Sequence, residues 1–495
     1  MPKKIKRNEF IKLSLMSGAG LYLSSCGLGN NKSTLVKQEK KNSIIKDSTL
    51  ANTPERIIEP TFKLYKKGDT QYDILRKGFN KRIDKYPAAI ALCTTTEEVA
   101  QAISYAIQNK LPVSIKSGGH SFEGFSYNNG SLVVDLSSIN QIIWEDEHTI
   151  TVGPGCKLSQ LYDDILPKNK ILPVGSCGSV GIAGLALGGG YGLFSRKYGL
   201  TCDSLLEFTM VDGKGNIIHS KDDPELLWAC KGGGNGNFGV ITSMKFSLKE
   251  APAFLQSYRF RIKNIGIKRA KDILEQWFSL TENLPLPCFS AFVLNGKSLY
   301  ILLTNCEEHN EETQKVITQL SALVDRTTKG KPTPLPSAVK VFYGEKNPLY
   351  FKNSSAGMYK NFDDIKDCIE KILGKIITTP DMIYQVNTLG GKIDDPDFVK
   401  QSSYSHREQK YLSELQTYWQ YPSQADRMIN AFEEVQQIFY ANGIKQQYRN
   451  YPDIQLKNWE SAYYGENYRR LQKVKSRYDL ENIFRYEQSI TPATS

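Results

Sequence analysis

The chain has 495 residues, enough for two or three domains, and its hydrophobic fraction of 40% and aromatic fraction of 11% exclude a disordered or fibrous protein. The formal net charge of +11 is concentrated at the start of the chain: residues 1–50 hold ten Lys or Arg against three Asp or Glu, which leaves only +4 for the other 445 residues. No dense basic stripe remains to clamp phosphates, so we expect no nucleic-acid partner.

The first 26 residues, "MPKKIKRNEFIKLSLMSGAGLYLSSC", have the basic start, short apolar stretch and small-residue end of a secretory signal. The apolar stretch is too short and too rich in Gly and Ser to span a bilayer comfortably. Its end, Leu23 to Cys26, resembles a bacterial lipobox. That resemblance implies cleavage before Cys26, a lipid on its sulfur, and an exported protein anchored to a membrane of the cell envelope. A plain secretory peptide with an incidental cysteine is the alternative.

The stretch "KRNEFIKL" also resembles a twin-arginine export signal, although Asn8 stands where the second arginine belongs. The export route, twin-arginine or general secretory, is therefore left open. Residues 27–55 are rich in Lys, Asn and Ser, which predicts a flexible tether between the anchor and the folded body.

From about residue 86 the sequence alternates between strand and helix patterns. "AAIALC" predicts a buried strand, "TTEEVAQAISYAIQNK" a capped amphipathic helix, and "LPVSIKS" a second strand, an order that favours a parallel α/β unit. Further on, "LLEFTMVDGKGNIIHS" predicts two strands around an Asp-Gly turn. We assign residues 56–250 to the first domain, with its core at about 86–250.

Between about 251 and 447 the pattern changes. "SYRFRI", "FSAFVLNGKSLYILLTN" and "LSELQTYW" predict strands, and "AKDILEQWFSLTENL", "TQKVITQLSALVD" and "QADRMINAFEEVQQIFYANG" predict amphipathic helices. We expect an α+β domain with an antiparallel sheet. The tail, 448–495, contains "WESAYYGENYRRLQKVKSRYD", which we expect to be helical.

The nine cysteines are an odd number, and eight remain if Cys26 carries lipid. Their spacings contain no CxxC pair, so we expect no zinc site and no other metal site. The compartment would permit disulfides, but the spacing does not say which cysteines would pair.

Three glycine-rich clusters adjoin predicted strands or helices, at 117–121 ("SGGHS"), 175–192 and 226–242. Glycines let the backbone turn tightly and let a ligand approach the main chain, and successive amides can form an anion-binding concavity. The second cluster is not the GxGxxG pattern that follows the first strand of a nicotinamide-binding fold. The clusters favour a large phosphorylated ligand over a set of long flexible loops.

Six stretches carry a resemblance to a known family: "SGGHSFEGFSY", "GSCGSVGIAGLALGGGYG", "RKYGLTCDSLL", "LLWACKGGGNGNFGVIT", "YRNYPD" and "YYGENYRRLQKVKSRYDLENIFRYEQSI". Together they resemble the berberine-bridge-enzyme-like flavin oxidases of the vanillyl-alcohol-oxidase/PCMH superfamily, over about residues 60–490. The resemblance implies a PCMH-type FAD-binding domain of two α/β subdomains at 56–250. It also implies an antiparallel-sheet substrate-binding domain with helices on one face at 251–447, and a tail at 448–495 that returns to the FAD domain.

The resemblance also implies how FAD is held. In this family the histidine of GGH bonds to the 8α-methyl carbon of the flavin and the cysteine of GxC bonds to C6; the matching residues are His120 and Cys177. Two covalent bonds would keep the cofactor on an exported protein and raise its reduction potential. Lys116 stands where the family usually has Arg, which keeps the charge. The other cofactor-binding residues implied are Ser117, Gly118, Gly119, Ser121, Val180, Gly181, Gly184, Gly188, Gly189, Gly190, Gly192, Val240 and Ile241.

A base must take the substrate's hydroxyl proton as hydride leaves. "YRNYPD" at 448–453 matches the family's YxNYxD element, whose second tyrosine is the base in sugar-oxidising members, so we expect Tyr451 to be the base and Tyr448 to line the same wall. A free phenol is a weak base near pH 7. Glu414 lies on the predicted strand "LSELQTYW", which matches a strand of the family. We expect Glu414 to take the proton from Tyr451 or to act as the base itself. The alternatives are a satisfied core phenol and an outward-facing carboxylate.

Val180 matches the family's gating position, where valine goes with oxidase behaviour, so we expect O2 as the acceptor and H2O2 as the co-product. A dehydrogenase with another acceptor is the close variant. Phe122 and Phe125 flank His120 and suit sugar rings or arenes alike. We expect oxidation of the reducing-end C1 of an oligosaccharide to a lactone, with an aromatic alcohol or secondary metabolite as the alternative substrate. Two alternatives come from other functional classes: a non-catalytic lipid-anchored binding protein, and the NADPH-dependent murein-synthesis reductase of the same superfamily.

Overall fold

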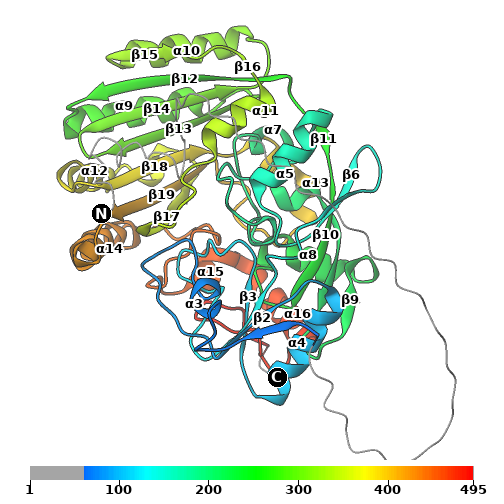
Figure 1. The fold of residues 1–495 in the computed structure, drawn as a ribbon. Helices are drawn as coiled ribbons and strands as arrows, with labels where there is room; N and C mark the ends of the chain where they lie inside the picture. Colours follow the sequence, from blue (N-terminus) through cyan, green and yellow to red (C-terminus); the bar gives the residue numbers. More distant parts are fainter. Residues whose placement is uncertain (1–60, 494–495) are drawn as a thin grey trace, which may run out of the picture.

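The computed structural model describes residues 61–493. The predicted signal, Cys26 and the predicted tether lie outside the described residues. Figure 1 shows two regions: a large sheet with its helices, and a second region that combines the first part of the chain with its end. Within residues 61–493 no helix is both long enough and apolar enough to cross a membrane.

A four-stranded sheet is built around the predicted strand–helix–strand unit. The elements are β1 Lys63–Tyr65, α3 Tyr72–Leu75, β2 Ala89–Leu92, α4 Thr96–Gln108, β3 Val113–Lys116 and β4 Leu132–Asp135. Strands β2 and β3 run parallel to β4, which lies between them, and β1 pairs antiparallel with β2. Thr95 caps α4 by accepting a hydrogen bond from the Glu98 amide (3.2 Å). The predicted α/β unit is therefore confirmed, with β4 inserted between its two strands.

A five-stranded antiparallel sheet follows, in the order β5-β6-β10-β8-β9. Its strands are β5 Ile142–Trp144, β6 Thr149–Val152, β8 Leu205–Val211, β9 Ile217–His219 and β10 Val240–Ser247, and a separate two-stranded pair joins β7 Lys170–Ile171 to β11 Lys249–Glu250. The predicted turn between β8 and β9 is present: Asp212 accepts hydrogen bonds from the amides of Lys214 (2.9 Å) and Asn216 (2.8 Å). The helices of this part are α5 Leu158–Ile165, α6 Ile182–Leu187, α7 Ser195–Tyr198 and α8 Pro224–Gly233.

The middle of the chain forms the large antiparallel sheet, which runs in the order β15-β12-β14-β13-β18-β19-β17, with β16 beside β12. Its strands are β12 Phe254–Lys263, β13 Cys288–Asn295, β14 Ser298–Asn305, β15 Arg326–Lys329, β16 Thr333–Pro334, β17 Tyr350–Tyr359, β18 Met382–Thr388 and β19 Tyr411–Trp419. Its helices are α9 Ile267–Thr281, α10 Glu311–Leu323, α11 Leu335–Ala338, α12 Ile369–Thr378, α13 Pro396–Lys400 and α14 Ala425–Ala441. The predicted antiparallel sheet is confirmed.

The two faces of this sheet belong to two different cores. On β13, Phe292 and Leu294 pack with the buried residues of α9, α12 and α14, whereas Phe289, Ala291 and Val293 join the core of the first region. Successive side chains of a strand point to opposite faces, so a strand that is buried on both faces ties two layers together. The helices cover one face, and the opposite face closes over the first region.

The tail returns to the first region. The predicted helix at 459–479 is broken into α15 Trp459–Tyr464 and α16 Tyr468–Tyr478, because Gly465 takes a left-handed conformation (φ +52°) between them. The buried Lys475 of α16 donates to the carbonyl oxygens of Asn237 and Phe484 (both 2.7 Å) and pairs with Asp479 (2.6 Å). Tyr451 lies shortly before α15, and its carbonyl accepts a hydrogen bond from the Ser355 amide of β17 (2.9 Å). The segment 448–453 therefore lies where both regions meet.

Candidate active site

Two glycine loops cross at the centre of the site. A Cβ atom at Gly118 would lie 2.3 Å from the Gly181 nitrogen, and one at Gly181 would lie 2.5 Å from the Gly118 nitrogen. Real Cβ atoms do not approach backbone so closely, so both positions require glycine for this contact. The crossing brings the loop that follows β3 against the loop that precedes α6, and a cavity opens beside it, lined by residues of both loops.

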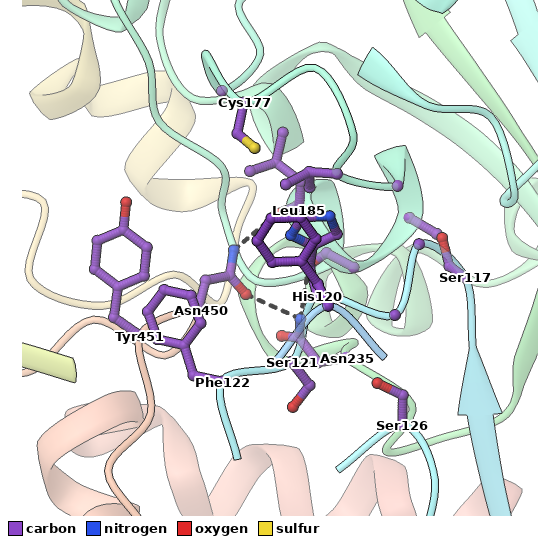
Figure 2. Close-up of a pocket in the computed structure, with 18 of the residues that line it drawn as sticks. Ser117, His120, Ser121, Phe122, Ser126, Cys177, Leu185, Asn235, Asn450 and Tyr451 are labelled. Carbon is purple, nitrogen blue, oxygen red and sulfur yellow. Dashed lines mark hydrogen bonds between the residues drawn. The ribbon is translucent and has the colours of Figure 1, made fainter. Parts of the chain in front are cut away.

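His120 and Cys177 line this cavity, one from each loop, and Figure 2 shows both side chains directed toward the same space. The imidazole of His120 stacks on Phe79 with ring centroids 4.2 Å apart. Burial and the nearby Lys157 lower the pKa of His120 to about 4, and a hydrogen bond with the Ser179 main chain opposes this shift. The imidazole is therefore neutral at physiological pH, the form in which a ring nitrogen can act as a nucleophile.

Cys177 differs from the other cysteines of residues 61–493, which are all buried, because it is only partly buried and faces the cavity. Burial raises the pKa of its thiol, and hydrogen bonds from Ser179 and Val180 oppose that shift. Its Sγ lies 3.6 Å from the Ser179 hydroxyl. Ser179 thus contacts both side chains that the sequence predicts to bond the cofactor.

Tyr451 stands on the wall of the cavity nearest the large sheet. Its ring stacks on Phe122 with centroids 5.2 Å apart and planes 11° apart (Figure 2). Its hydroxyl lies 3.0 Å from the Tyr191 hydroxyl, which accepts a hydrogen bond from the Asn387 amide (3.2 Å). Burial, with the neighbouring Tyr191 and Glu414, raises the pKa of Tyr451 well above its usual value of 10, so the phenol is neutral.

Glu414 projects from β19 into the same cavity and is buried. Burial raises the pKa of its carboxyl to about 8, and hydrogen bonds from Gln416 and Asn353 oppose this shift. Of the two side chains predicted to handle the proton, Glu414 is therefore the one that changes charge near neutral pH. The outward-facing alternative for Glu414 is wrong, because the strand turns this side chain inward.

Tyr448 also lines the cavity, but its hydroxyl is already occupied. It accepts hydrogen bonds from the Gly190 amide and from the Asn450 side-chain amide (both 3.0 Å). Tyr448 therefore holds the tail segment against the second glycine cluster. Most of the other predicted cofactor residues line the cavity as well: Ser117, Gly118, Gly119, Ser121, Val180, Gly181, Gly184, Gly192 and Ile241.

Lys116 lies outside the cavity. Its ammonium pairs with Asp135 on the neighbouring strand (3.2 Å) and donates to the Leu75 carbonyl. Lys116 is not among the residues that line the cavity, and its predicted contact with the cofactor stays a prediction. Val240 likewise packs in the core of the first sheet.

Gly188, Gly189 and Gly190 also stand outside the lining of the cavity. A Cβ at Gly188 would meet the Asn450 oxygen at 2.1 Å, one at Gly189 the Tyr404 ring at 2.6 Å, and one at Gly190 the Thr201 hydroxyl at 2.5 Å. The glycine run therefore accommodates other parts of the chain that pack against it. The prediction that it contacts the cofactor directly is not supported.

Several residues that line the cavity received no role from the sequence, among them Tyr191, Asn387 and Arg449. Tyr191 is a bulky residue within a glycine run, which was a usable signal. Arg449 stands at the first of the two variable positions of the YxNYxD element. Asn387 stands on a strand with no motif around it, and only the sheet topology brings it to the site.

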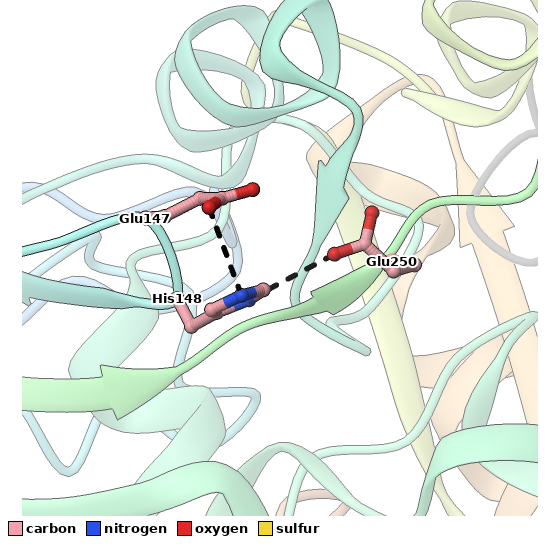
Figure 3. Close-up of side chains that lie close together, drawn as sticks. All are labelled: Glu147, His148 and Glu250. Atoms are coloured by element: carbon pink, nitrogen blue, oxygen red, sulfur yellow. Dashed lines mark ion pairs between the residues drawn. The ribbon is translucent and has the colours of Figure 1, made fainter.

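Outside the cavity, one group of residues has the composition of a metal site. Glu147, His148 and Glu250 are exposed and lie close together, as Figure 3 shows. Lys170 places its ammonium on both carboxylates, 3.0 Å from Glu147 and in direct contact with Glu250. Since a lysine already neutralises these acids, we assign them to an ion-pair cluster.

Comparison with known proteins shows an FAD-binding domain and the family of the chain. Residues 87–221 match the family described as "FAD binding domain", and residues 447–491 match "Berberine and berberine like". The chain is 30% identical over 452 residues to the uncharacterized FAD-linked oxidoreductase YgaK of Bacillus subtilis (strain 168), across 87% of this chain and 97% of that protein. It is 26% identical over 473 residues to the glucooligosaccharide oxidase of Sarocladium strictum, across 85% and 90% of the two chains. The solved glucooligosaccharide oxidase from Acremonium strictum superposes with a TM-score of 0.79 at 23% identity, across 88% of this chain and 98% of that one.

The α+β fold and the glycine-lined cavity define an FAD-binding flavoprotein, and the matched proteins make it an FAD-linked oxidoreductase. The chain belongs to the berberine-bridge-enzyme-like family of FAD oxidases. The expectations for the fold class, for FAD and for the enzyme class are confirmed.

The residues of the cavity fit FAD. The crossing glycines expose main chain to the cavity, as a diphosphate requires. Asn235, which also lines the cavity, keeps a buried oxygen with no hydrogen-bond partner in the described part of the chain. Leaving such an atom unpaired is costly, and a hydrogen bond from a ligand in the cavity would satisfy it.

Proposed function

We propose that the protein holds FAD through covalent bonds from both His120 and Cys177. The observation that carries the proposal is that these two side chains, 57 positions apart in the sequence, line one cavity at the crossing of their two loops. The neutral imidazole supports it, since only an unprotonated nitrogen can form the bond. The glucooligosaccharide oxidase of similar fold is described as carrying a 6-S-cysteinyl, 8α-N1-histidyl FAD.

The reaction that the cavity supports is oxidation of a hydroxyl-bearing carbon. Bound FAD supplies the hydride acceptor and delivers the electrons to O2, which becomes H2O2. The chain must bind the hydroxyl and hold its proton. Val180 lines the cavity at the position that goes with oxidase behaviour in the family, which supports O2 as the acceptor.

Glu414 and Tyr451 divide the handling of that proton. A neutral phenol cannot take a proton unless it gives its own away, and the pKa of Tyr451 is too high for it to be ionised beforehand. The carboxyl of Glu414, with a pKa of about 8, is partly ionised at neutral pH and can hold the proton. Tyr451, kept in place by Tyr191 and Phe122, then hydrogen-bonds and orients the substrate hydroxyl. This assignment follows the second of the two roles that the sequence left open for Glu414.

We propose an oligosaccharide as the substrate, oxidised at its reducing-end C1 to a lactone. Relatives named as oligosaccharide oxidases include the glucooligosaccharide oxidase, and the stacked pair of Phe122 and Tyr451 offers an aromatic surface on which a sugar ring can pack. The side-chain amides of Asn353 on β17 and Asn387 on β18, the two strands that flank β19, line the same cavity and provide polar partners for hydroxyl groups.

A panel of reducing oligosaccharides and aromatic alcohols, read by H2O2 release, tests the substrate. We expect peroxide with at least one reducing oligosaccharide, and none with the same sugar reduced to its alditol, which lacks the C1 hemiacetal. Peroxide released only with aromatic alcohols would select the alternative substrate class. Protein whose yellow colour does not bleach with any compound of the panel would favour a binding protein.

We also propose that the protein is exported and carries a lipid on Cys26, although these residues lie outside the described part. The support is the lipobox-like end of the signal. In cells, the full-length protein should label with palmitate and remain with the membrane fraction, whereas Cys26→Ser should do neither. Equal labelling of both proteins would contradict the proposal.

A further inference from the structure

Arg449 is a buried cation on the wall of the cavity. It occupies the first variable position of the YxNYxD element, is 6% exposed, and lines the same space as His120 and Cys177. Its guanidinium donates to the hydroxyl groups of Tyr464 (2.9 Å) and Tyr486 (2.8 Å). It also lies over the rings of Phe125, Tyr463 and Tyr486 at 5.5 to 5.8 Å from their centroids.

No carboxylate neutralises this cation among residues 61–493, since none of the ion pairs in that part of the chain includes Arg449. Three other buried cations have carboxylate partners: Lys352 pairs with Glu123 and Asp453, Arg407 with Asp203, and Lys475 with Asp479. Arg196, which is also buried, donates to main-chain carbonyls instead and lies outside the cavity. Phenol hydroxyls and ring faces compensate a buried charge only in part, so an anion on a ligand in the cavity would stabilise the Arg449 guanidinium.

The cavity has one candidate for its positive charge. Lys116, which the sequence suggested for that role, pairs with Asp135 outside the cavity. Among the described residues that line the cavity, Arg449 is the one Lys or Arg. FAD brings two negative charges in its diphosphate, and its pyrimidine ring gains negative charge when the cofactor is reduced. The cavity therefore combines one Lys or Arg side chain, Arg449, with an anionic cofactor.

The surroundings of Arg449 place it on the cofactor side of the cavity. Its contacts described above come from the loop after His120, through Phe125, and from the tail, through Tyr463, Tyr464 and Tyr486. The loop that holds Phe125 begins at Ser121, whose hydroxyl accepts a hydrogen bond from the Phe125 amide (3.0 Å). Glu414 and Asn387, in contrast, come from the large sheet. The location favours an anion on the cofactor over a carboxylate on the substrate.

We propose that Arg449 is the counter-cation for the negative charge that FAD carries in this cavity. The inference rests on FAD binding alone, so it stands or falls separately from the proposed substrate. The charge could reside on the diphosphate or on the reduced pyrimidine ring, and the two sources predict different measurements.

Reversible binding gives the first measurement. In the double variant His120→Ala/Cys177→Ala, FAD and riboflavin are titrated by flavin fluorescence, with Arg449 intact or replaced as Arg449→Gln or Arg449→Lys. If Arg449 faces the diphosphate, Arg449→Gln weakens FAD binding by about ten- to a hundredfold, Arg449→Lys weakens it much less, and riboflavin binding is unchanged. If the double variant does not fold, the FAD content per chain of the otherwise unchanged holoenzyme gives the same comparison.

The midpoint potential of the holoenzyme gives the second measurement. If Arg449 faces the pyrimidine ring, Arg449→Gln disfavours the reduced cofactor about tenfold, which lowers the potential by about 30 mV for a two-electron couple. Arg196→Gln is the control for losing a buried guanidinium, because Arg196 donates to main-chain carbonyls outside the cavity, including those of Cys288 and Leu284. It should leave both the affinity and the potential unchanged. The proposal is overturned if Arg449→Gln changes neither quantity, or if Arg449→Lys loses as much as Arg449→Gln.

Discussion

At the scale of single residues, the proton chemistry depends on two side chains whose pKa values lie far apart. The cavity keeps Tyr451 as a neutral phenol and leaves Glu414 to titrate near pH 8. The sequence identified both residues, because each stands in a recognisable stretch. It did not identify Tyr191 and Asn387, whose hydrogen bonds hold the Tyr451 hydroxyl in place, since these partners come together only through the packing of the large sheet on the first region.

Tyr451→Phe removes the hydroxyl that orients the substrate and keeps the ring that stacks on Phe122. We expect the flavin to stay attached and its reduction by substrate to slow by about a hundredfold or more, the usual size of such a contribution. Stopped-flow absorbance under anaerobic conditions measures this step. An unchanged rate of reduction would remove Tyr451 from the mechanism.

Glu414 predicts how the reaction depends on pH. A carboxyl with a pKa of about 8 becomes ionised as the pH rises, so flavin reduction at saturating substrate should accelerate from pH 7 to pH 9 and then level off. Glu414→Gln should be slow and should show no such rise, whereas Tyr451→Phe should be slow but keep it. A rise that survives in Glu414→Gln would assign the ionisation to another group.

At the scale of elements, the site depends on the crossing of two loops. The glycines near this crossing have different roles. Gly118 and Gly181 allow the two loops to cross, whereas Gly188, Gly189 and Gly190 leave room for other segments of the chain that pack against them. In the sequence all five belong to one kind of motif. Composition alone therefore predicted that glycine was needed in each cluster, but the structure was required to say what each one approaches.

Gly181→Ala tests the crossing. Its added methyl would lie 2.2 Å from the Ser117 hydroxyl and 2.5 Å from the Gly118 nitrogen, so the two loops must separate, and His120 and Cys177 with them. We expect a large loss of covalently bound flavin, measured as absorbance that remains with the protein after acid precipitation. Gly266→Ala, at the start of α9 and outside the cavity, is the matched control, because a Cβ there meets no described atom within 4 Å. Equal flavin content in the two variants would show that the crossing does not position the site.

At the scale of the whole molecule, a buried ion cluster joins the three parts that form the cavity. Lys352 of β17 pairs with Glu123, in the loop after His120, and with Asp453, just beyond Tyr451 (2.8 Å). Arg82 pairs with the other carboxylate oxygen of Glu123 (2.7 Å). Burial raises and the Lys352 ammonium lowers the pKa of Asp453, with a net shift downward. The sequence predicted the two regions and the returning tail, but nothing in it paired Lys352 with acids 229 and 101 positions away.

Lys352→Met leaves Asp453 and Glu123 buried with less positive charge beside them. We expect the free energy of unfolding to fall by about 3–5 kcal/mol, as when one partner of a buried pair is removed. Lys375→Met, which breaks the exposed pair with Glu434, should cost about 0–1 kcal/mol. Urea unfolding followed by tryptophan fluorescence compares the two, and an equal loss in both variants would mean that the cluster does not hold the parts together.

The mass of the denatured mature polypeptide tests the central claim most directly. The account predicts that the wild-type chain carries one additional FAD, that His120→Ala and Cys177→Ala each still carry it through the remaining bond, and that the double variant carries none. A wild-type chain without the added mass, or a single variant that loses all of it while the other retains it in full, would contradict attachment through both side chains.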